Sequence, residues 1–294
     1  MDKLIITVTV DSNMSYPRNP YCPKFDDVEG YVQQYVDAIR AGASIAHIHG
    51  VHRLEDKIQA DGKRLSRIDF EGWRRMQEGI RSKTDALVQF GIASARLDEK
   101  IRLMDYHPDM MSYCYNPHDE HFQPDPDYPA NEMYAIHSRD ELFEYSRAAY
   151  EKKVKVEIEA FQTGAFWNVN YIRKNGILKP DPLWTTLFLG WPGGCWMPPT
   201  PQALIFFVDQ VPEKTNWNVS VMDPKTQVNI LTLAIMMGGH VRVGWEDNPY
   251  IRPGEWARSN AQLVENIVEI ATKLGREVAT PAEARQIIGY DFNQ

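Results

Sequence analysis

AGASIAHIH, at residues 41–49, is the stretch that decides the fold. Its small residues are typical of a helix end, and the apolar residues that follow predict a strand over 45–49. Much later in the chain, MGGHVRVGWEDN at residues 237–248 repeats this succession of helix end, strand and polar residues. Both stretches therefore place polar side chains just past a strand that follows a helix, as alternating strand–helix units do.

The rest of the chain continues this alternation. Strands are predicted at 4–10, 45–49, 86–90, 110–113, 155–160, 184–189, 215–221 and 240–243, and helices at 26–42, 69–82, 97–104, 139–152, 201–210, 226–237, 259–274 and 281–288. Eight alternating units favour one α/β domain over residues 1–294, a (β/α)8 TIM-type barrel, more than an open doubly wound sheet. No GxGxxG motif follows the first strand, which argues against a dinucleotide-binding fold. A Pro- and acid-rich stretch near 116–130 is predicted to be an inserted loop.

The composition excludes several classes of protein. The 294 residues are 43% hydrophobic and 24% charged, which is typical of a soluble globular protein. The net charge of −8 argues against a nucleic-acid partner. No apolar run is long enough for a membrane span, and no signal peptide precedes the first strand. Three widely spaced cysteines, without a CxxC pair, indicate a reducing compartment, so we expect a cytoplasmic protein.

Two histidines and a carboxylate form a candidate metal site. His47 and His49 lie at i and i+2 of a strand and therefore project from the same face. In a closed barrel only the first strand separates the second from the eighth, so Glu246 can meet both imidazoles at the C-terminal mouth. Three protein ligands leave one position open, which indicates a catalytic zinc site, although another divalent ion could bind the same ligands.

Four blocks of sequence carry a family resemblance. They are residues 41–49 and 238–248, SNAQLVE at 259–265 and GREVATPAEAR at 275–285. On these blocks the chain resembles the β-keto acid cleavage enzymes, whose type member is the 3-keto-5-aminohexanoate cleavage enzyme. The resemblance implies a zinc-dependent TIM-type barrel that forms a homo-oligomer, usually a tetramer. It also implies a retro-Claisen exchange, in which a β-keto acid and acetyl-CoA give acetoacetate and a new acyl-CoA thioester.

The resemblance also implies roles for individual residues. His47, His49 and Glu246 would bind Zn²⁺, which would polarise the β-keto group as a Lewis acid. Asp247 would be the catalytic base that removes the α-proton of acetyl-CoA, and Arg242 would pair with it. The residues themselves agree with this reading, because a carboxylate beside a dication needs a partner that positions it and tunes its pKa.

The sequence departs from the family where substrate is usually held. An acidic residue after the first strand of the type member aligns with Asn13 or Met14 here, a serine aligns with Gly91 and a threonine with Cys114. The residues that we expect to bind substrate are Asn13, Gly91, Cys114, Glu159 and Trp245. These changes leave open which β-keto acid is used, and whether acetyl-CoA is the acceptor.

The predicted pocket is roomier and less polar than that of the type member. Neither Asn13 nor Met14 can form a strong ion pair with an ammonium group, and two hydroxyl donors are missing. We therefore expect a bulkier β-keto acid with an aromatic or a trimethylammonium tail. The aromatic side chains expected around this tail are Trp191, Trp245 and Tyr113.

The remaining titratable residues give weaker signals. His240 is expected to be a hydrogen-bonded core residue at the far end of the barrel. Glu157 and Glu159 end one strand on the same face, and one of them is expected to hold a ligand or a partner side chain. Four further histidines are predicted to lie on the surface, and His52 is expected to be a solvated loop residue. These four are His107, His118, His121 and His137.

Two other classes of function compete with this reading. A different metal-dependent carbon–carbon lyase or a hydrolase of the amidohydrolase type could use the same barrel. Amidohydrolases usually place their HxH pair on the first strand and add histidines after the fifth and sixth strands. Here the pair is on the second strand, and the fifth and sixth end in Glu159 and in Leu189-Gly190-Trp191, which disfavours hydrolysis. A non-catalytic binding protein would not need Arg242 and Asp247 beside an open metal position.

Overall fold

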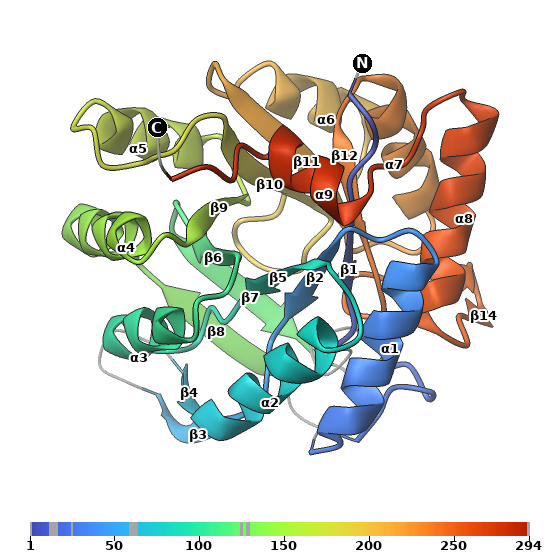
Figure 1. Ribbon diagram of the computed structural model, residues 1–294, viewed down its shortest axis with the longest axis horizontal. Helices are drawn as coiled ribbons and strands as arrows, with labels where there is room; N and C mark the ends of the chain where they lie inside the picture. Colours follow the sequence, from blue (N-terminus) through green and yellow to red (C-terminus); the bar gives the residue numbers. More distant parts are fainter. Residues whose placement is uncertain are drawn as a thin grey trace.

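The computed structural model describes residues 2–11, 17–24, 26–58, 64–123, 126–127 and 130–292, with the side chains of 52–58, 64–66 and 131 left out. Eight of its strands form the central sheet: β1 (Ile6–Thr9), β2 (Ile45–Ile48), β5 (Leu87–Phe90), β6 (Met110–Cys114), β9 (Lys155–Ala160), β10 (Leu183–Leu189), β11 (Thr215–Val221) and β12 (His240–Val243). They are parallel and close in the order β1-β12-β11-β10-β9-β6-β5-β2 (Figure 1). The predicted (β/α)8 barrel is therefore confirmed.

Helices connect these strands around the outside of the barrel (Figure 1). They are α1 (Val28–Arg40), α2 (Phe70–Arg81), α3 (Leu97–Leu103), α4 (Arg139–Glu151), α5 (Gly164–Arg173), α6 (Pro201–Val208), α7 (Gln227–Met236), α8 (Asn260–Lys273) and α9 (Pro281–Ile287). The sequence did not predict α5, because its residues begin with glycine and include aromatic and β-branched types of modest helix propensity. Among the helices that the structure describes, none has the length and apolar character needed to cross a membrane.

Three short antiparallel hairpins extend from the ends of barrel strands. They are β3 (His52–Ile58) with β4 (Arg64–Ile68) after β2, β7 (His118–Phe122) with β8 (Asn131–Ala135) after β6, and β13 (Tyr250–Arg252) with β14 (Glu255–Trp256) after β12. The stretch near 116–130, predicted to be an inserted loop, thus contains a strand, and that prediction was wrong. Polar residues fill buried positions of β7, which hides the apolar alternation that usually reveals a strand.

The N-terminal end of the barrel is mainly apolar and closed. Inward-facing side chains there pack against Ala284 of α9 and against Ile288, and α9 lies across this end in Figure 1. His240 belongs to this layer: its Nδ1 accepts a hydrogen bond from the Ile5 backbone N–H at 3.0 Å, and its ring stacks on Trp184. The predicted core histidine is therefore confirmed. The strand residues of this apolar layer are Ile5, Ile45, Leu87, Met110 and Trp184.

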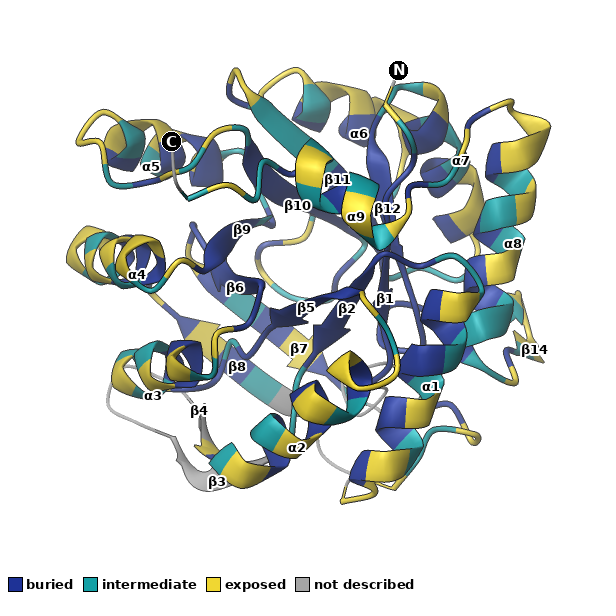
Figure 2. Cartoon of the chain, viewed as in Figure 1, coloured by how far each residue is buried: buried dark blue, intermediate teal, exposed yellow. Residues whose placement is uncertain are grey.

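Two residues further along each strand, the inward-facing side chains are polar. Because the side-chain period of a strand is two, these positions lie on the same inner face as the apolar layer. All of them are buried, in agreement with the dark blue barrel strands of Figure 2. This polar layer consists of Thr7, His47, Gln89, Ser112, Glu157, Thr186, Asn218 and Arg242. The barrel therefore brings ionisable side chains to the base of its C-terminal mouth.

Candidate active site and metal centre

A cavity opens at the C-terminal mouth of the barrel, and the empty space in and directly above it, open solvent included, is about 570 Å³. His47, His49, Arg242 and Glu246 line one part of it, at the ends of β2 and β12. The remaining lining residues come from the ends of β9 and β10, from neighbouring loops and from hairpin β7–β8. They are Ile92, Ala93, Ser94, His118, Glu120, Met133, Glu159, Phe161, Phe188 and Trp191. The cavity thus combines potential metal ligands, carboxylates and an aromatic wall.

The structure brings together the three residues predicted to bind metal. One possible ligand atom from each of His47, His49 and Glu246 lies within 4.8 Å of the others. Two of the three already form an ion pair, in which His49 Nε2 lies 2.9 Å from a Glu246 carboxylate oxygen. β1 separates β2 from β12 in the barrel, so this proximity is a consequence of closure.

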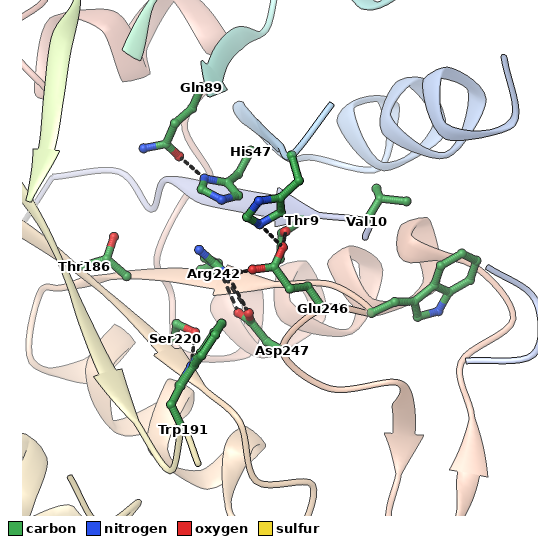
Figure 3. Close-up of polar contacts among 12 residues, drawn as sticks. Thr9, Val10, His47, Gln89, Thr186, Trp191, Ser220, Arg242, Glu246 and Asp247 are labelled. Atoms are coloured by element: carbon green, nitrogen blue, oxygen red, sulfur yellow. Dashed lines mark hydrogen bonds and ion pairs between the residues drawn. The ribbon is translucent and has the colours of Figure 1, made fainter. Parts of the chain in front are cut away.

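Neighbouring side chains fix the orientation of these ligands. The Nδ1 atom of His47 lies 3.0 Å from Gln89 Oε1, and the Thr9 hydroxyl donates a hydrogen bond to Glu246 (Figure 3). His47 Nε2 is buried and has no hydrogen-bond partner among the described residues. A Cβ at Gly91 would lie 2.4 Å from His47 Cε1, so only glycine leaves room for this imidazole. An orphaned ring nitrogen beside a second histidine and a carboxylate fits a metal ion.

Arg242 holds two adjacent carboxylates. Its guanidinium donates to Asp247 Oδ1 at 2.8 Å through Nη2 and also donates to Glu246, so it lies between the two (Figure 3). Burial raises the pKa of Asp247 to about 6, although the charge of Arg242 opposes this. Burial would also raise the pKa of Glu246, but the charges of Arg242 and His49 outweigh this effect. They hold the pKa of that carboxyl well below its usual range. Arg242 and Glu246 line the cavity, and Asp247 lies behind them.

The two glutamates of β9 have different surroundings. Glu157 is fully buried in the polar layer, accepts a hydrogen bond from the Thr186 hydroxyl and has its other oxygen 3.9 Å from His47 Nδ1. Burial and the nearby charge of Glu159 raise the pKa of Glu157 to about 8. Glu159 instead lines the cavity, and burial raises its pKa while the charge of His118 lowers it. Glu157 therefore contacts the candidate metal site, and Glu159 faces the substrate space.

The residues expected to bind substrate are not all at the cavity. Asn13 and Met14 lie outside the described residues, as does the side chain of His52. Trp245 is a core residue whose Nε1 donates to the Ala257 carbonyl at 3.1 Å, and Cys114 is buried beside the cavity without lining it.

The aromatic side chains expected around the substrate tail are also divided. Trp191 lines the cavity, and its Nε1 donates to the Ser220 hydroxyl at 3.0 Å. The hydroxyl of Tyr113 instead donates to Glu141, and its ring packs against Tyr145. Of Trp191, Trp245 and Tyr113, the structure therefore leaves only Trp191 in the cavity wall.

Two histidines predicted to lie on the surface are buried. His118 and His137 are almost inaccessible to solvent, and His118 lines the cavity together with Glu120. The prediction failed because the ring of His118 packs against Phe161 at the barrel mouth and that of His137 packs against Tyr113. No local signal in the sequence indicated this, because the buried positions of β7 include the polar residues His118 and Glu120.

Comparison with known proteins identifies the family. A model of the beta-keto acid cleavage enzyme family matches residues 3–290. The chain is 34% identical over 298 residues, covering 98% of each protein, to a 3-keto-5-aminohexanoate cleavage enzyme of Fusobacterium nucleatum subsp. nucleatum. The chain therefore belongs to the β-keto acid cleavage enzyme family and is an enzyme of that class, which confirms the resemblance seen in the sequence.

More distant matches extend the comparison. Over 146 residues, 49% of this chain and 47% of the relative, the chain is 34% identical to a 3-dehydrocarnitine:acetyl-CoA trimethylamine transferase of Rhizobium meliloti (strain 1021). Among solved structures, a complex of ObcA with oxaloacetate superimposes with a TM-score of 0.68 at 15% identity, covering 92% of this chain and 67% of that one. This structural likeness shows the shared barrel fold.

Proposed function

We propose that this family member exchanges a β-keto acid with acetyl-CoA, giving acetoacetate and an acyl-CoA, at a zinc site made of His47, His49 and Glu246. The observation that carries the proposal is the buried, unpartnered Nε2 of His47 where His49 and Glu246 converge. A relative named as an acetyl-CoA-dependent transferase supports acetyl-CoA as the co-substrate.

Nitrogen and carboxylate ligands suit Zn²⁺, and they also suit other divalent ions. When bound there, the ion supplies Lewis-acid polarisation of the keto oxygen. His47 and His49 offer imidazole nitrogens and Glu246 a carboxylate oxygen, and three protein ligands leave room for substrate. Gln89 and Thr9 keep these ligands oriented.

The balance of the reaction identifies the proton that must be removed. C2 of the β-keto acid loses a proton and bonds to the acetyl carbon of acetyl-CoA, and the CoA thiolate leaves. That thiolate then attacks the original keto carbon, and the bond from this carbon to C2 breaks. The carbanion at C2 takes back the proton from the base and leaves with the acetyl group as acetoacetate. The proton therefore comes from C2 of the keto acid, and not from acetyl-CoA as the resemblance implies.

Asp247 is the proposed base for this proton, in partnership with Arg242. The carboxylate adjoins Glu246, and two nitrogens of Arg242 hold it in place. Arg242 also reaches the cavity, where its charge stabilises the negative charge that develops on the substrate. Glu159, which lines the cavity, is the alternative base, and Asp247→Asn and Glu159→Gln variants distinguish the two.

The cavity wall favours a substrate with a cationic tail. Glu120 and Glu159 supply negative charge, while Phe161, Phe188 and Trp191 supply aromatic faces. A cation over an indole or phenyl ring gains about 0.5–2 kcal/mol. The name of one relative refers to an aminohexanoate and that of another to trimethylamine. The nitrogen of an amino group and that of trimethylamine both carry positive charge near neutral pH.

A substrate panel tests the proposed reaction. Pure protein is incubated with acetyl-CoA and β-keto acids whose tails are ammonium, trimethylammonium, neutral aromatic or carboxylate, and acetoacetate is measured. We expect the highest kcat/KM for a cationic tail, and we expect Glu159→Gln to lower kcat/KM for the cationic substrates alone. The absence of acetoacetate with every member of the panel would contradict the exchange reaction, and a preference for the carboxylate tail would contradict the specificity.

Metal analysis tests the zinc site separately. Protein purified without chelator should contain one more equivalent of zinc per chain than a His47→Ala/His49→Ala variant purified in the same way. Equal zinc contents in the two proteins would contradict the assignment of His47, His49 and Glu246.

The assembly state is a further part of the proposal. We infer a homo-oligomer, with a tetramer as the expected form, because large apolar side chains are exposed on three successive helices. Trp167 of α5, Phe206 of α6 and Met236 of α7 are each more than half exposed. Light scattering should give a multiple of the 33.9 kDa chain mass, and Phe206→Glu should lower it. A monomeric mass for the wild-type protein would contradict the inferred homo-oligomer.

The cytoplasmic location stays a prediction.

A further inference from the structure

A second cluster of potential metal ligands lies beside the cavity. Cys114 ends β6, His118 begins β7 and His137 follows β8. One possible ligand atom from each of the three lies within 4.8 Å of the others, and all three residues are buried. None of them belongs to the group of His47, His49 and Glu246, so the cluster needs its own explanation.

The two histidines of this cluster share one arrangement. Nε2 of His118 lies 2.8 Å from a Glu120 carboxylate oxygen, and Nδ1 of His137 lies 3.4 Å from one of Glu141. The opposite ring nitrogens, His118 Nδ1 and His137 Nε2, are buried without a hydrogen-bond partner among the described residues. Metal-binding histidines typically have a carboxylate on one nitrogen and the ion on the other. Since an unpartnered buried polar atom is costly, both free nitrogens point to a missing ligand.

We propose that Cys114, His118 and His137 form a second metal site, separate from the proposed catalytic one, that takes a zinc-like divalent ion. A thiolate and two imidazoles are a donor set that Zn²⁺ prefers. Binding replaces the thiol proton of Cys114, which is released to solvent. Three protein ligands leave the fourth position of a tetrahedral ion to water.

The ion would fasten hairpin β7–β8 to the barrel. Cys114 belongs to a barrel strand, whereas His118 and His137 belong to the hairpin and its exit, so one ion would join the two units. His118 and Glu120 of the same hairpin line the cavity. The second site would therefore hold one wall of the substrate pocket in place. It does not depend on the reaction that we propose for the first site.

Cobalt substitution tests the proposal, because only the second site contains a thiolate. Metal-free protein reconstituted with Co²⁺ should bind two equivalents per chain and show a thiolate-to-cobalt charge-transfer band in the near ultraviolet. Cys114→Ser should lose that band and one equivalent. The matched control Cys195→Ser removes a neighbouring thiol, which contacts the Pro117 carbonyl, and should keep both.

The same cobalt measurement shows which of the two proposed metal sites is wrong. A wild-type spectrum without the thiolate band overturns the second site, whatever the variants do, and so does a band that survives Cys114→Ser. If Cys114→Ser does not fold, His137→Gln should weaken cobalt binding at the thiolate site, and undiminished binding there would overturn the proposal. A His47→Ala/His49→Ala variant should keep the band and lose the other equivalent. If that variant keeps both the thiolate band and two equivalents of cobalt, the result would contradict the catalytic site and support the second metal site.

Discussion

The two ends of the barrel interior are built from the same strands but have different chemistry. At the N-terminal end most inward side chains are apolar and α9 closes them, with Lys155 and His240 as buried polar exceptions. Two residues further along the inward side chains are polar, and His47 and Arg242 among them line the cavity. The pairs Ile45 and His47, Leu87 and Gln89, and Trp184 and Thr186 show this change on single strands. The same strand geometry therefore supports both the apolar layer, which stabilises the barrel, and the polar layer, which carries the ionisable side chains.

The two layers contribute to stability in opposite ways. Burial of apolar side chains contributes about 25 cal/mol for each Å² removed from water. Burial of Arg242 with Glu246 and Asp247 instead carries a desolvation penalty, which opposes the attraction within the ion pairs. We infer that the apolar end stabilises the ionisable side chains that the mouth needs.

The largest effect is expected at the polar end, for Asp247→Asn. The amide is nearly isosteric but cannot accept a proton, so kcat should fall about 10²–10⁴-fold while the metal content stays unchanged. Acetoacetate formation measures the rate, and Glu255→Gln, which changes an exposed carboxylate of β14, is the matched control. Wild-type turnover in Asp247→Asn would contradict this role and indicate that Glu157 or Glu159 is the base.

Trp184→Ala should have the largest effect at the apolar end. Removing a fully buried indole leaves a cavity and should lower the free energy of unfolding by about 3–5 kcal/mol. Denaturant titration measures this loss, and metal content should be unchanged in the folded protein. Trp196→Ala, at an exposed indole, should change stability by less than about 0.5 kcal/mol. Equal losses of stability in the two variants would contradict the stabilising role of the apolar end.

A smaller effect is expected for Gln89→Leu, which keeps the volume of a polar-layer side chain but removes its contact with His47. Loss of the partner that orients a histidine ligand typically lowers metal affinity about 10–100-fold. Competition with a chelator measures this affinity, and Gln33→Leu on the exposed face of α1 is the control. Unchanged affinity in Gln89→Leu would show that Gln89 does not position His47.

For each pH unit, the smallest effect is expected in the pH dependence of stability at the apolar end. Burial, together with the charge of Arg276, lowers the pKa of His240 from 6.5 to about 3. Below pH 6.5 the unfolded state therefore binds a proton that the folded state does not, and the contribution of His240 to stability is lost as the pH falls towards 3. The slope is at most about 1.4 kcal/mol per pH unit. His240→Gln should flatten it, and parallel stability curves for the two proteins would contradict the shifted pKa.

The sequence by itself determined the barrel and the candidate metal ligands. Strand and helix periodicity is a local property, so alternating units could be counted without knowledge of distant contacts. His47 and His49 share a strand face for the same reason, and closure of eight parallel strands brings Glu246 to them. His240 could be placed as well, since its position on the strand fixed both its face and its end of the barrel.

Only the tertiary structure decided the walls of the pocket. Whether Trp245 or Trp191 faces the cavity depends on how long loops fold over the mouth, and local patterns do not specify this. His118 and His137 look like surface residues in sequence, because polarity normally indicates exposure. They are buried because His118 packs against Phe161 and His137 against Tyr113, while Glu120 and Glu141 pair with their ring nitrogens, and these contacts exist only after the chain has folded.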